Sequence, residues 1–234
     1  MKLELCAASM EAILLARKYP FDRIELCQNL EQGGMTPSPG FIEYALACGV
    51  ETHVLIRPRP GGFCYSNDEI EIILRDIREC KVIGAQGVVI GALQEDGWIN
   101  QKAIESMMRQ ADGMEVTFHR AFDDLVSFEK PLNQLIELGV NRVLTSGLAS
   151  NVEWGMNNLK SMVEYVDGKI EIMSGGGVNA SNIAKIRDEV NPDAIHFSAT
   201  AKKPINEESR FSETILQVNE DKLVRLLMEL DVDV

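Results

Sequence analysis

Short apolar or β-branched runs recur along the chain, and the segment between neighbouring runs is long enough for a helix and two turns. Such runs are typical of buried strands. Eight strands are therefore predicted, over residues 3–6, 21–27, 52–57, 87–91, 115–119, 141–145, 169–173 and 194–198. Eight strand–helix units most simply close into one α/β barrel, a (β/α)8 TIM barrel, with a doubly wound open sheet as the alternative.

Helix boundary signals stand between these strands. Three helix starts are predicted from capping patterns, at Thr36 with Pro37, Ser66 with Glu69, and Ser150 with Glu153. Gly49, Gly84 and Gly139 are each expected to end a helix in the left-handed backbone conformation. No linker divides the chain, so residues 1–234 are predicted as a single domain, whose last ~35 residues form a loop and a helix against the barrel.

Polar side chains occupy every second position of several predicted strands. Successive side chains of a strand point to opposite faces, so one set meets the helices and the other fills the barrel. The inward set contains Glu4, Cys6, Glu25, Cys27, His53, Arg57, His119 and His196. Barrel interiors are usually apolar, and buried charges need partners. We expect those partners to be found within one group, Glu4, Glu25 and Glu171 with Arg57 and the histidines.

Two interpretations of this polar interior stay open. A self-satisfied ionic core would specify strand register and have no further role. A functional site is favoured by position, because ligands of such barrels bind at the carboxyl ends of the strands. The residues that end their strands are Cys6, Cys27, Arg57, His119 and Ser198.

A glycine-rich turn follows the seventh strand and leads into a helix predicted to begin near 179–181. Backbone amides at Gly175, Gly176 and Gly177 could bind a phosphate or carboxylate there. The alternative is a tight turn that needs positive φ angles.

Two other strand ends carry charged loops. The segment 117–123 brings His119, Arg120 and Asp123 close together, which suits proton transfer and anion binding, or else a rim ion pair between Arg120 and Asp123. The segment 57–62, which begins at Arg57, could clamp an anion or stiffen a loop.

The cysteines form no CxxC pair, and in a reducing compartment they are expected to be free thiols. Cys6 and Cys27 end adjacent strands, so their side chains should lie roughly 5 Å apart and could hold Cu(I). The alternative is that both are buried as small apolar residues. Cys48 and Cys80 fall on predicted helices, where packing is the expected role.

Charge and hydropathy exclude several classes of partner. The formal net charge is −13 and no cluster of Lys and Arg stands out, which argues against nucleic acid and anionic membranes. No stretch is long and apolar enough to span a bilayer, and Glu4 interrupts any secretory leader. A cytoplasmic location is expected.

Several motifs together strongly resemble the CutC family. They are Asp22–Cys27, Gly33–Ser38, Ile56–Arg59, Thr117–Asp123 and Leu144–Gly147, and the likeness extends to His196–Ala199. The family usually has Leu or a similar residue where this chain has Met35. The resemblance implies a TIM barrel, a cytoplasmic protein that self-associates as a dimer or tetramer, and a role in copper homeostasis, with copper bound at Cys6 and Cys27.

Two functions compete at this point, and a scaffold with a vestigial site is a weaker third. In the first, Cys6 and Cys27 hold Cu(I). In the second, an enzyme acts on a small anionic ligand that carries, for example, a phosphate. The candidate catalytic residues are Glu4, Glu25, Arg57, His119 and Asp123. The candidate ligand-binding residues are Ser146, Gly175, Gly176, Gly177, His196 and Ser198.

Overall fold

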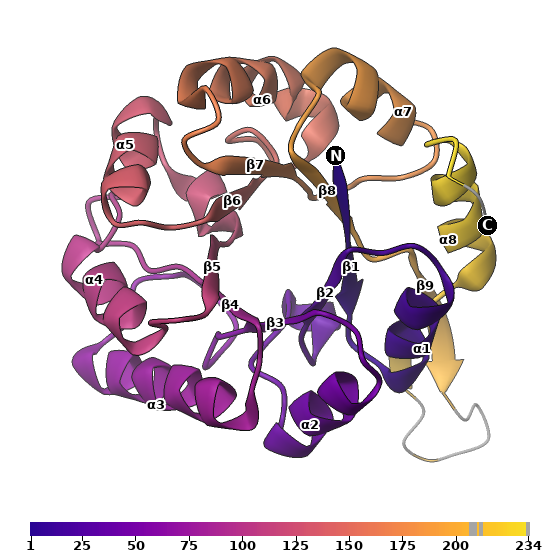
Figure 1. Cartoon of the computed structure of the whole chain (residues 1–234), viewed down its shortest axis with the longest axis horizontal. Coiled ribbons are helices and arrows are strands. Elements are labelled where there is room, and N and C mark those ends of the chain that lie inside the picture. Colours follow the sequence, from indigo (N-terminus) through magenta and orange to yellow (C-terminus); the bar gives the residue numbers. More distant parts are fainter. Residues whose placement is uncertain (206–209, 211–212, 233–234) are drawn as a thin grey trace.

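The computed structural model describes residues 1–205, 210 and 213–232. Eight parallel strands close into a barrel in sequence order, and helices surround it (Figure 1). The strands are β1 (Lys2–Ala7), β2 (Arg23–Leu26), β3 (Thr52–Leu55), β4 (Gly87–Ile90), β5 (Glu115–Phe118), β6 (Arg142–Thr145), β7 (Glu171–Ser174) and β8 (Ala194–Phe197). The predicted (β/α)8 barrel is therefore confirmed, with strand bounds that differ by at most two residues, and the doubly wound alternative is wrong.

The surrounding helices are α1 (Met10–Lys18), α2 (Pro39–Ala47), α3 (Asn67–Ile83), α4 (Gln101–Gln110), α5 (Glu129–Glu137), α6 (Val152–Val166) and the short α7 (Ile183–Lys185). Within the described residues, no helix is long and apolar enough to cross a membrane. The predicted capping box of Ser66 and Glu69 is confirmed at the start of α3.

Two predicted helix starts are wrong by one or two residues. The α2 helix is capped by Ser38 and has Pro39 in its first turn, because the pair Ser38-Pro39 offers the same capping chemistry as Thr36-Pro37. The α6 helix is capped by Asn151, whose side chain accepts hydrogen bonds from two amides of the first turn.

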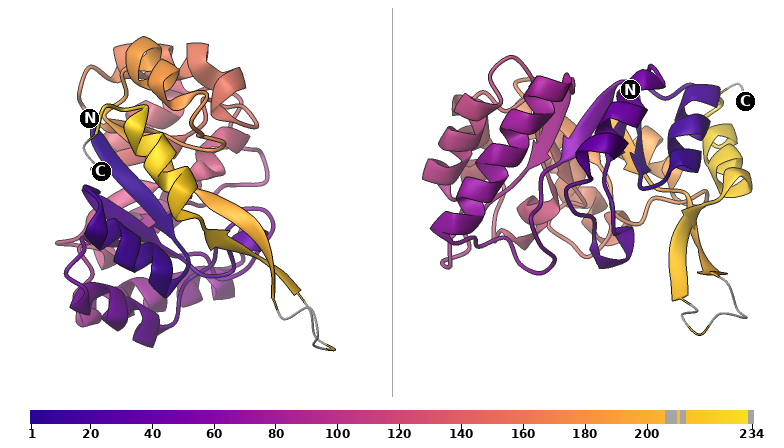
Figure 2. Two further views of the ribbon diagram at one scale, coloured as in Figure 1. Left: turned by 90° about the vertical axis from the view of Figure 1, so that its right-hand side faces the viewer. Right: turned by 90° about the horizontal axis from the view of Figure 1, so that it is seen from below.

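The end of the chain differs from the predicted loop and helix. A two-stranded antiparallel hairpin, β9 (Thr200–Ile205) and β10 (Glu213–Val218), precedes the predicted helix, α8 (Glu220–Met228). The hairpin projects beyond the barrel, whereas α8 lies beside the first and last strands (Figure 2). The amide of Asn219 donates to the carbonyl of Ala199 at 2.9 Å and so ties the start of α8 to the end of β8.

The alternation predicted for the strands is observed. Leu3, Leu5 and Ala7 join the large core between barrel and helices. The barrel interior has two small apolar clusters of its own, one of Cys6, Cys27, Leu55 and Val89 and one of Leu144, Met173 and Ala194. Polar side chains fill the rest of the interior.

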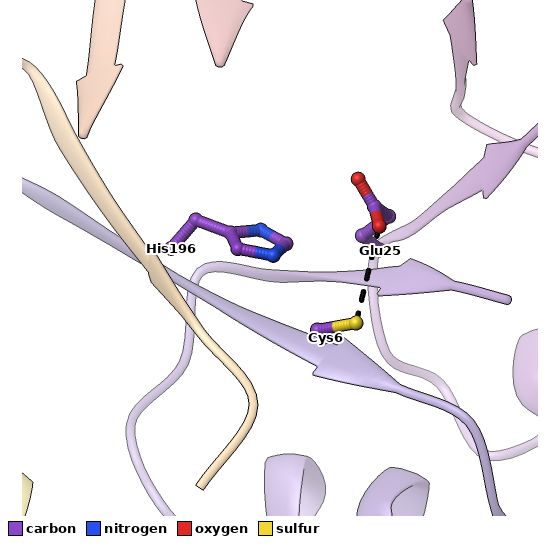
Figure 3. A group of neighbouring side chains, drawn as sticks. All are labelled: Cys6, Glu25 and His196. Carbon is purple, nitrogen blue, oxygen red and sulfur yellow. Dashed lines mark hydrogen bonds between the residues drawn. The ribbon is translucent and has the colours of Figure 1, made fainter. Parts of the chain in front are cut away.

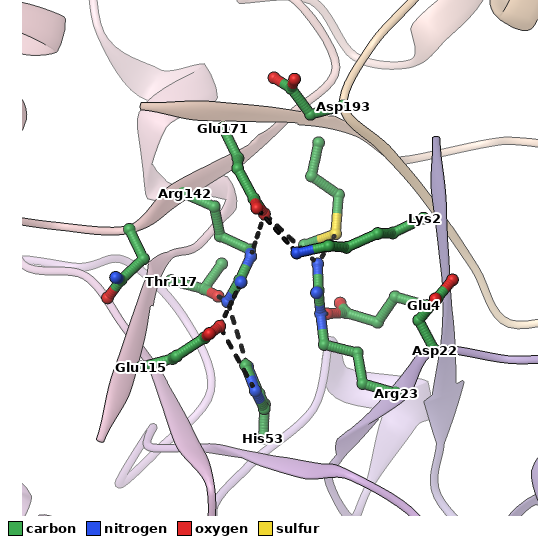
Figure 4. Close-up of polar contacts among 12 residues, drawn as sticks. Lys2, Glu4, Asp22, Arg23, His53, Glu115, Thr117, Arg142, Glu171 and Asp193 are labelled. Atoms are coloured by element: carbon green, nitrogen blue, oxygen red, sulfur yellow. Dashed lines mark hydrogen bonds and ion pairs between the residues drawn. The ribbon is translucent and has the colours of Figure 1, made fainter. Parts of the chain in front are cut away.

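An ionic floor closes the amino-terminal end of the barrel (Figure 4). Its centre is a pair of guanidinium groups, Arg23 and Arg142, each 1% exposed. Arg23 Nε donates to Glu4 at 2.5 Å, and Arg142 Nε donates to Glu171 at 3.0 Å, while Arg142 also pairs with Glu115. The predicted partnership of Glu4 and Glu171 with Arg57 is wrong. The strand register sets Arg23 directly opposite Glu4 and Arg142 directly opposite Glu171.

Candidate active site

A cavity of about 430 Å³ opens at the carboxyl ends of the strands. We call it the mouth cavity. Its polar lining includes Cys6, Glu25, Arg57, His119, Arg120, Gly176, Gly177, His196 and Ser198. Most of the predicted site residues are therefore brought together, at the end of the barrel where ligands of this fold bind.

Glu25, Cys6 and His196 are neighbours (Figure 3), and all three line the mouth cavity. Parallel pairing sets Cys6 opposite Glu25 and Glu4 opposite His196, so residues from β1, β2 and β8 meet. The Cys6 sulfur, one carboxylate oxygen of Glu25 and one ring nitrogen of His196 all lie within 4.8 Å of one another. The Cys6 thiol points to Glu25 Oε1 at 3.9 Å.

Glu4 lies beneath this group and fixes His196. The distance from His196 Nδ1 to Glu4 Oε1 is 2.7 Å, and Glu4 is fully buried. Burial alone would raise the pKa of Glu4, but the hydrogen bond and charge of His196, with the charge of Arg23, lower it to about 2. Glu4 is therefore a permanent carboxylate that orients the imidazole and leaves its Nε2 for the cavity.

The pKa values of Glu25 and His196 are both raised. Burial raises the pKa of Glu25 to about 7, against the opposing charge of His196 and with help from that of Glu4. Burial lowers the pKa of His196, but the charge of Glu25 and the bonds to Cys6 and Glu4 outweigh it and hold the pKa well above its usual 6.5. At neutral pH the site thus holds an imidazolium beside a carboxyl group poised between its two forms.

His119 plays a different part from His196. Its Nδ1 accepts a hydrogen bond from the amide of Ala121 at 3.1 Å, and its buried Nε2 has no partner among the described residues. Burial, with the charge of Arg57, lowers its pKa to about 3. The ring is therefore neutral with its proton on Nε2, which leaves that N–H as an unpaired donor within the described structure.

The absence of a side chain at Gly91 makes room for this imidazole. A Cβ atom at Gly91 would lie 2.4 Å from Cε1 of His119. The neighbouring strand therefore has to carry glycine at this inward position.

Arg57 braces two loops instead of pairing with a carboxylate. Its Nη1 donates to the carbonyls of Gln32 and Gly34, at 3.0 and 2.9 Å, and its Nη2 donates to that of Gly61 at 2.7 Å. Its Nε is buried and has no partner in the described structure. The loop-stiffening alternative is thus observed for Arg57.

Arg120 is positioned by Asp123 and Ser146, which do not line the mouth cavity. Asp123 accepts hydrogen bonds from Arg120 Nε at 2.8 Å and from the Ser146 amide and hydroxyl. Arg120 Nη2 in turn donates to Ser146 Oγ at 2.8 Å. The predicted rim ion pair is present, and its result is to hold a guanidinium at the mouth cavity.

The glycine-rich turn supplies backbone donors. Gly176 and Gly177 have φ angles of 93° and 84°, and both line the cavity together with Val178. No acceptor in the described structure bonds their amides or that of Val178, whereas the Gly175 amide donates to Thr145. The helix predicted near 179–181 is wrong in its start, because α7 begins only at Ile183. The amides without an acceptor therefore belong to the glycine-rich turn and not to the first turn of a helix.

The sulfur atoms of Cys6 and Cys27 are closer than predicted, with a Sγ–Sγ distance of 3.8 Å. Cys6 lines the cavity, but Cys27 does not, and it packs among Leu55, Val89 and Leu30. Their strand positions are not equivalent, since Cys6 pairs in register with Glu25. The bond to Cys27, followed by burial, raises the pKa of Cys6 well above 9.0.

The comparisons with known proteins agree with this architecture. The family model described as CutC family matches residues 1–201. This chain belongs to the CutC family. The CutC family protein of Glaesserella parasuis is 43% identical over 87% of this chain and 84% of its own length. That of Bacteroides thetaiotaomicron is 43% identical over 85% of this chain and 80% of its own.

Solved structures extend the comparison to three dimensions. The CutC protein of Streptococcus agalactiae, which its name assigns provisionally to copper homeostasis, is 34% identical, with a TM-score of 0.79 over 84% of this chain and 97% of its own. A phosphoribosylanthranilate isomerase from Pyrococcus furiosus, 13% identical with a TM-score of 0.61, covers 99% of this chain and 98% of its own. That second likeness shows the barrel fold alone.

Sequence reasoning missed the two arginines of the floor and assigned the mouth arginine, Arg120, only to a rim ion pair or anion contact. A signal for the floor existed in the strand period, since Arg23 stands two residues before Glu25, and Arg142 two before Leu144. The same period that placed the glutamates inside places these guanidinium groups inside. No comparable signal in the sequence showed that Arg57 would bond to loop carbonyls.

Proposed function

We propose that this CutC family member is an enzyme that moves a proton of a small anionic molecule bound in the mouth cavity. The observation that carries this proposal is Glu25, a buried carboxyl group with a pKa of about 7 that lines the cavity. A general acid or base is most effective when its pKa lies near the working pH. Its position opposite Cys6 in the strand register, in the wall of a cavity at the carboxyl ends of the strands, places this group where a ligand of the fold would bind.

The neighbouring groups have complementary roles. Deprotonated Glu25 takes a proton from the substrate, and the His196 imidazolium stabilises the negative charge that develops on a substrate oxygen. Glu4 keeps His196 charged and correctly turned through their 2.7 Å bond. His119 Nε2 donates a further hydrogen bond, and Arg120 with the open amides of the glycine turn attracts the anion.

The test measures solvent deuterium exchange. Metabolite pools are first screened by thermal shift for ligands that stabilise the protein. Each ligand that binds is then incubated with the protein in D2O, and NMR follows the loss of its C–H signals. Wild-type protein should catalyse exchange, and Glu25→Gln should slow it about 10²- to 10⁴-fold while ligand binding persists.

The matched control is Glu43→Gln, which alters an exposed glutamate of α2 that lines neither large cavity. It should exchange at the wild-type rate. Failure of every anionic ligand to stabilise the protein, or equal exchange by wild type and Glu25→Gln, would refute the proposal.

A second candidate function, Cu(I) binding, is favoured by the 3.8 Å separation of the Cys6 and Cys27 sulfurs. Thiolates are preferred ligands of Cu(I), and the His196 imidazole lies beside Cys6. The raised pKa of Cys6 opposes this use, because the thiol must release its proton before it binds metal. The donor set therefore fits a soft ion, at the cost of proton release.

Anaerobic titration with Cu(I) tests this second candidate. Wild-type protein should bind about one ion with proton release, and the double variant Cys6→Ser, Cys27→Ser should lose that binding. Cys48→Ser serves as the control, since Cys48 lies at the end of α2, away from the cavity. Unchanged affinity in the double variant would exclude these cysteines as the copper site. A cytoplasmic location and self-association into a dimer or tetramer stay predictions from the family resemblance.

A further inference from the structure

A second cavity, of about 520 Å³, lies on the other side of the glycine-rich turn. We call it the α8 cavity, because residues of α8 form one wall. The turn and the end of β8 form the others, through Gly177 to Ser181 and Ser198 to Thr200. The two cavities share Gly177, Val178 and Ser198 in their linings, so they adjoin one another.

The lining of the α8 cavity is basic in a strongly acidic protein. The chain has a net charge of −13, yet no Asp or Glu lines this cavity, whereas Lys222 and Arg225 of α8 both do. Lys222 Nζ is held in place by the carbonyl of Thr200 at 3.0 Å. Among the described residues, no carboxylate lies within ion-pair distance of Arg225. A guanidinium that pairs with no carboxylate of the protein is available to bind an anionic ligand.

Neutral donors complete the wall. The hydroxyl groups of Ser198 and Thr200 lie 3.2 Å apart, and the amides of Gly177 and Val178 have no acceptor in the described structure. Hydroxyl groups, amides and a guanidinium are the donors that bind phosphate oxygens in proteins. In this fold a phosphate commonly sits at the loops after the seventh and eighth strands.

We propose that the α8 cavity binds a phosphate group, with Arg225 as its main charged contact. The assignment of a substrate class rests on the function proposed above: the substrate is a small phosphate monoester. Its phosphate occupies the α8 cavity, and its reacting carbon reaches past the shared wall of Gly177 and Ser198 to Glu25. His196 and Ser198 belong to the same strand end, which keeps the two ends of the substrate site in fixed relation.

The test uses inorganic phosphate as the probe. Its affinity is measured by titration calorimetry at constant ionic strength for wild type and for Arg225→Gln. Wild type should bind one phosphate saturably, and Arg225→Gln should raise the Kd at least about tenfold, because a charge-assisted hydrogen bond is lost. Arg225 is exposed, so the variant should fold normally.

Two controls separate the alternatives. Arg17→Gln removes an exposed charge on α1 outside both cavities and should leave the Kd unchanged. Arg120→Gln reports on the mouth cavity. No saturable phosphate binding, equal weakening by Arg17→Gln, or weakening by Arg120→Gln alone would each overturn the α8 site.

A third variant distinguishes this proposal from the one on which it rests. Glu25→Gln should bind phosphate with wild-type affinity, because Glu25 does not line the α8 cavity. If phosphate binding needs Arg225 while no phosphate monoester undergoes exchange, the catalytic proposal fails and the phosphate site stands. If exchange needs Glu25 but only ligands without phosphate react, the substrate class is wrong and the catalytic proposal stands.

Discussion

The sharpest stability prediction concerns Glu4→Gln, which replaces a fully buried carboxylate by a neutral amide. The substitution keeps the size of the side chain and removes its charge. Arg23 would then lose its 2.5 Å partner, and His196 would lose the group that holds its proton. Few other single changes in this barrel affect both the ionic floor and the mouth cavity.

The expected cost follows from the pKa of Glu4, which is about 2 instead of 4.5. That difference corresponds to about 3 kcal/mol of folding free energy at neutral pH. Breaking a buried ion pair by removing one partner typically costs about 3–5 kcal/mol. The two figures describe the same interaction and are not added, so Glu4→Gln should destabilise the protein by about 3–5 kcal/mol at pH 7.

The sign of the pH dependence is also fixed. A carboxyl group with a lowered folded-state pKa stabilises the protein above its unfolded pKa, and this contribution is lost as pH falls toward the folded value. The difference between wild type and variant should therefore shrink by about 2 kcal/mol between pH 7 and pH 3. His196 has the opposite sign, since its contribution is complete below 6.5 and fades only as pH rises through its raised pKa.

Urea unfolding followed by circular dichroism, at several pH values between 3 and 7, measures this difference. Glu43→Gln is the control, because Glu43 is exposed and should change stability by no more than about 0.5 kcal/mol. A Glu4→Gln protein within about 1 kcal/mol of wild type at pH 7 would refute the reasoning. So would a difference that stays constant as pH falls.

Two further predictions concern the reaction and the packing. With Glu25 acting as a base, the rate of solvent deuterium exchange should rise with pH and level off above about 7, where its carboxyl group is deprotonated; a flat profile would contradict this. Gly155→Ala should destabilise the protein by about 2 kcal/mol or more in urea unfolding, because its Cβ would lie 1.7 Å from the Ser146 carbonyl oxygen. Gly40→Ala, with nothing within 4 Å, should be neutral or slightly stabilising; equal effects of the two would refute the packing argument.

The barrel could be predicted because its signals are local. Each strand is a short apolar run, and the alternation within it assigned Glu4, Glu25, His119 and His196 to the interior, where the structure has them. The capping box at Ser66 is likewise a pattern of neighbouring residues. The CutC motifs added the family, which the comparisons confirm.

The partners of those interior residues could not be predicted, because register between strands decides them. A shift between neighbouring strands would have set Cys6 opposite Cys27, as expected from their matching motifs, but the observed register sets it opposite Glu25. The same holds for Arg57, whose side chain meets three carbonyls of two loops. The shape of a loop is not encoded in any short pattern around that arginine.

The ionic floor also has a kinetic consequence. Arg23 and Arg142 plug the amino-terminal half of the barrel, and neither lines the mouth cavity. A ligand of that cavity must therefore enter and leave at the carboxyl ends of the strands. For the enzyme proposed above, product and substrate occupy the same cavity, so product that accumulates should act as a competitive inhibitor, and the rate at which it departs through this end should limit turnover whenever proton transfer is fast.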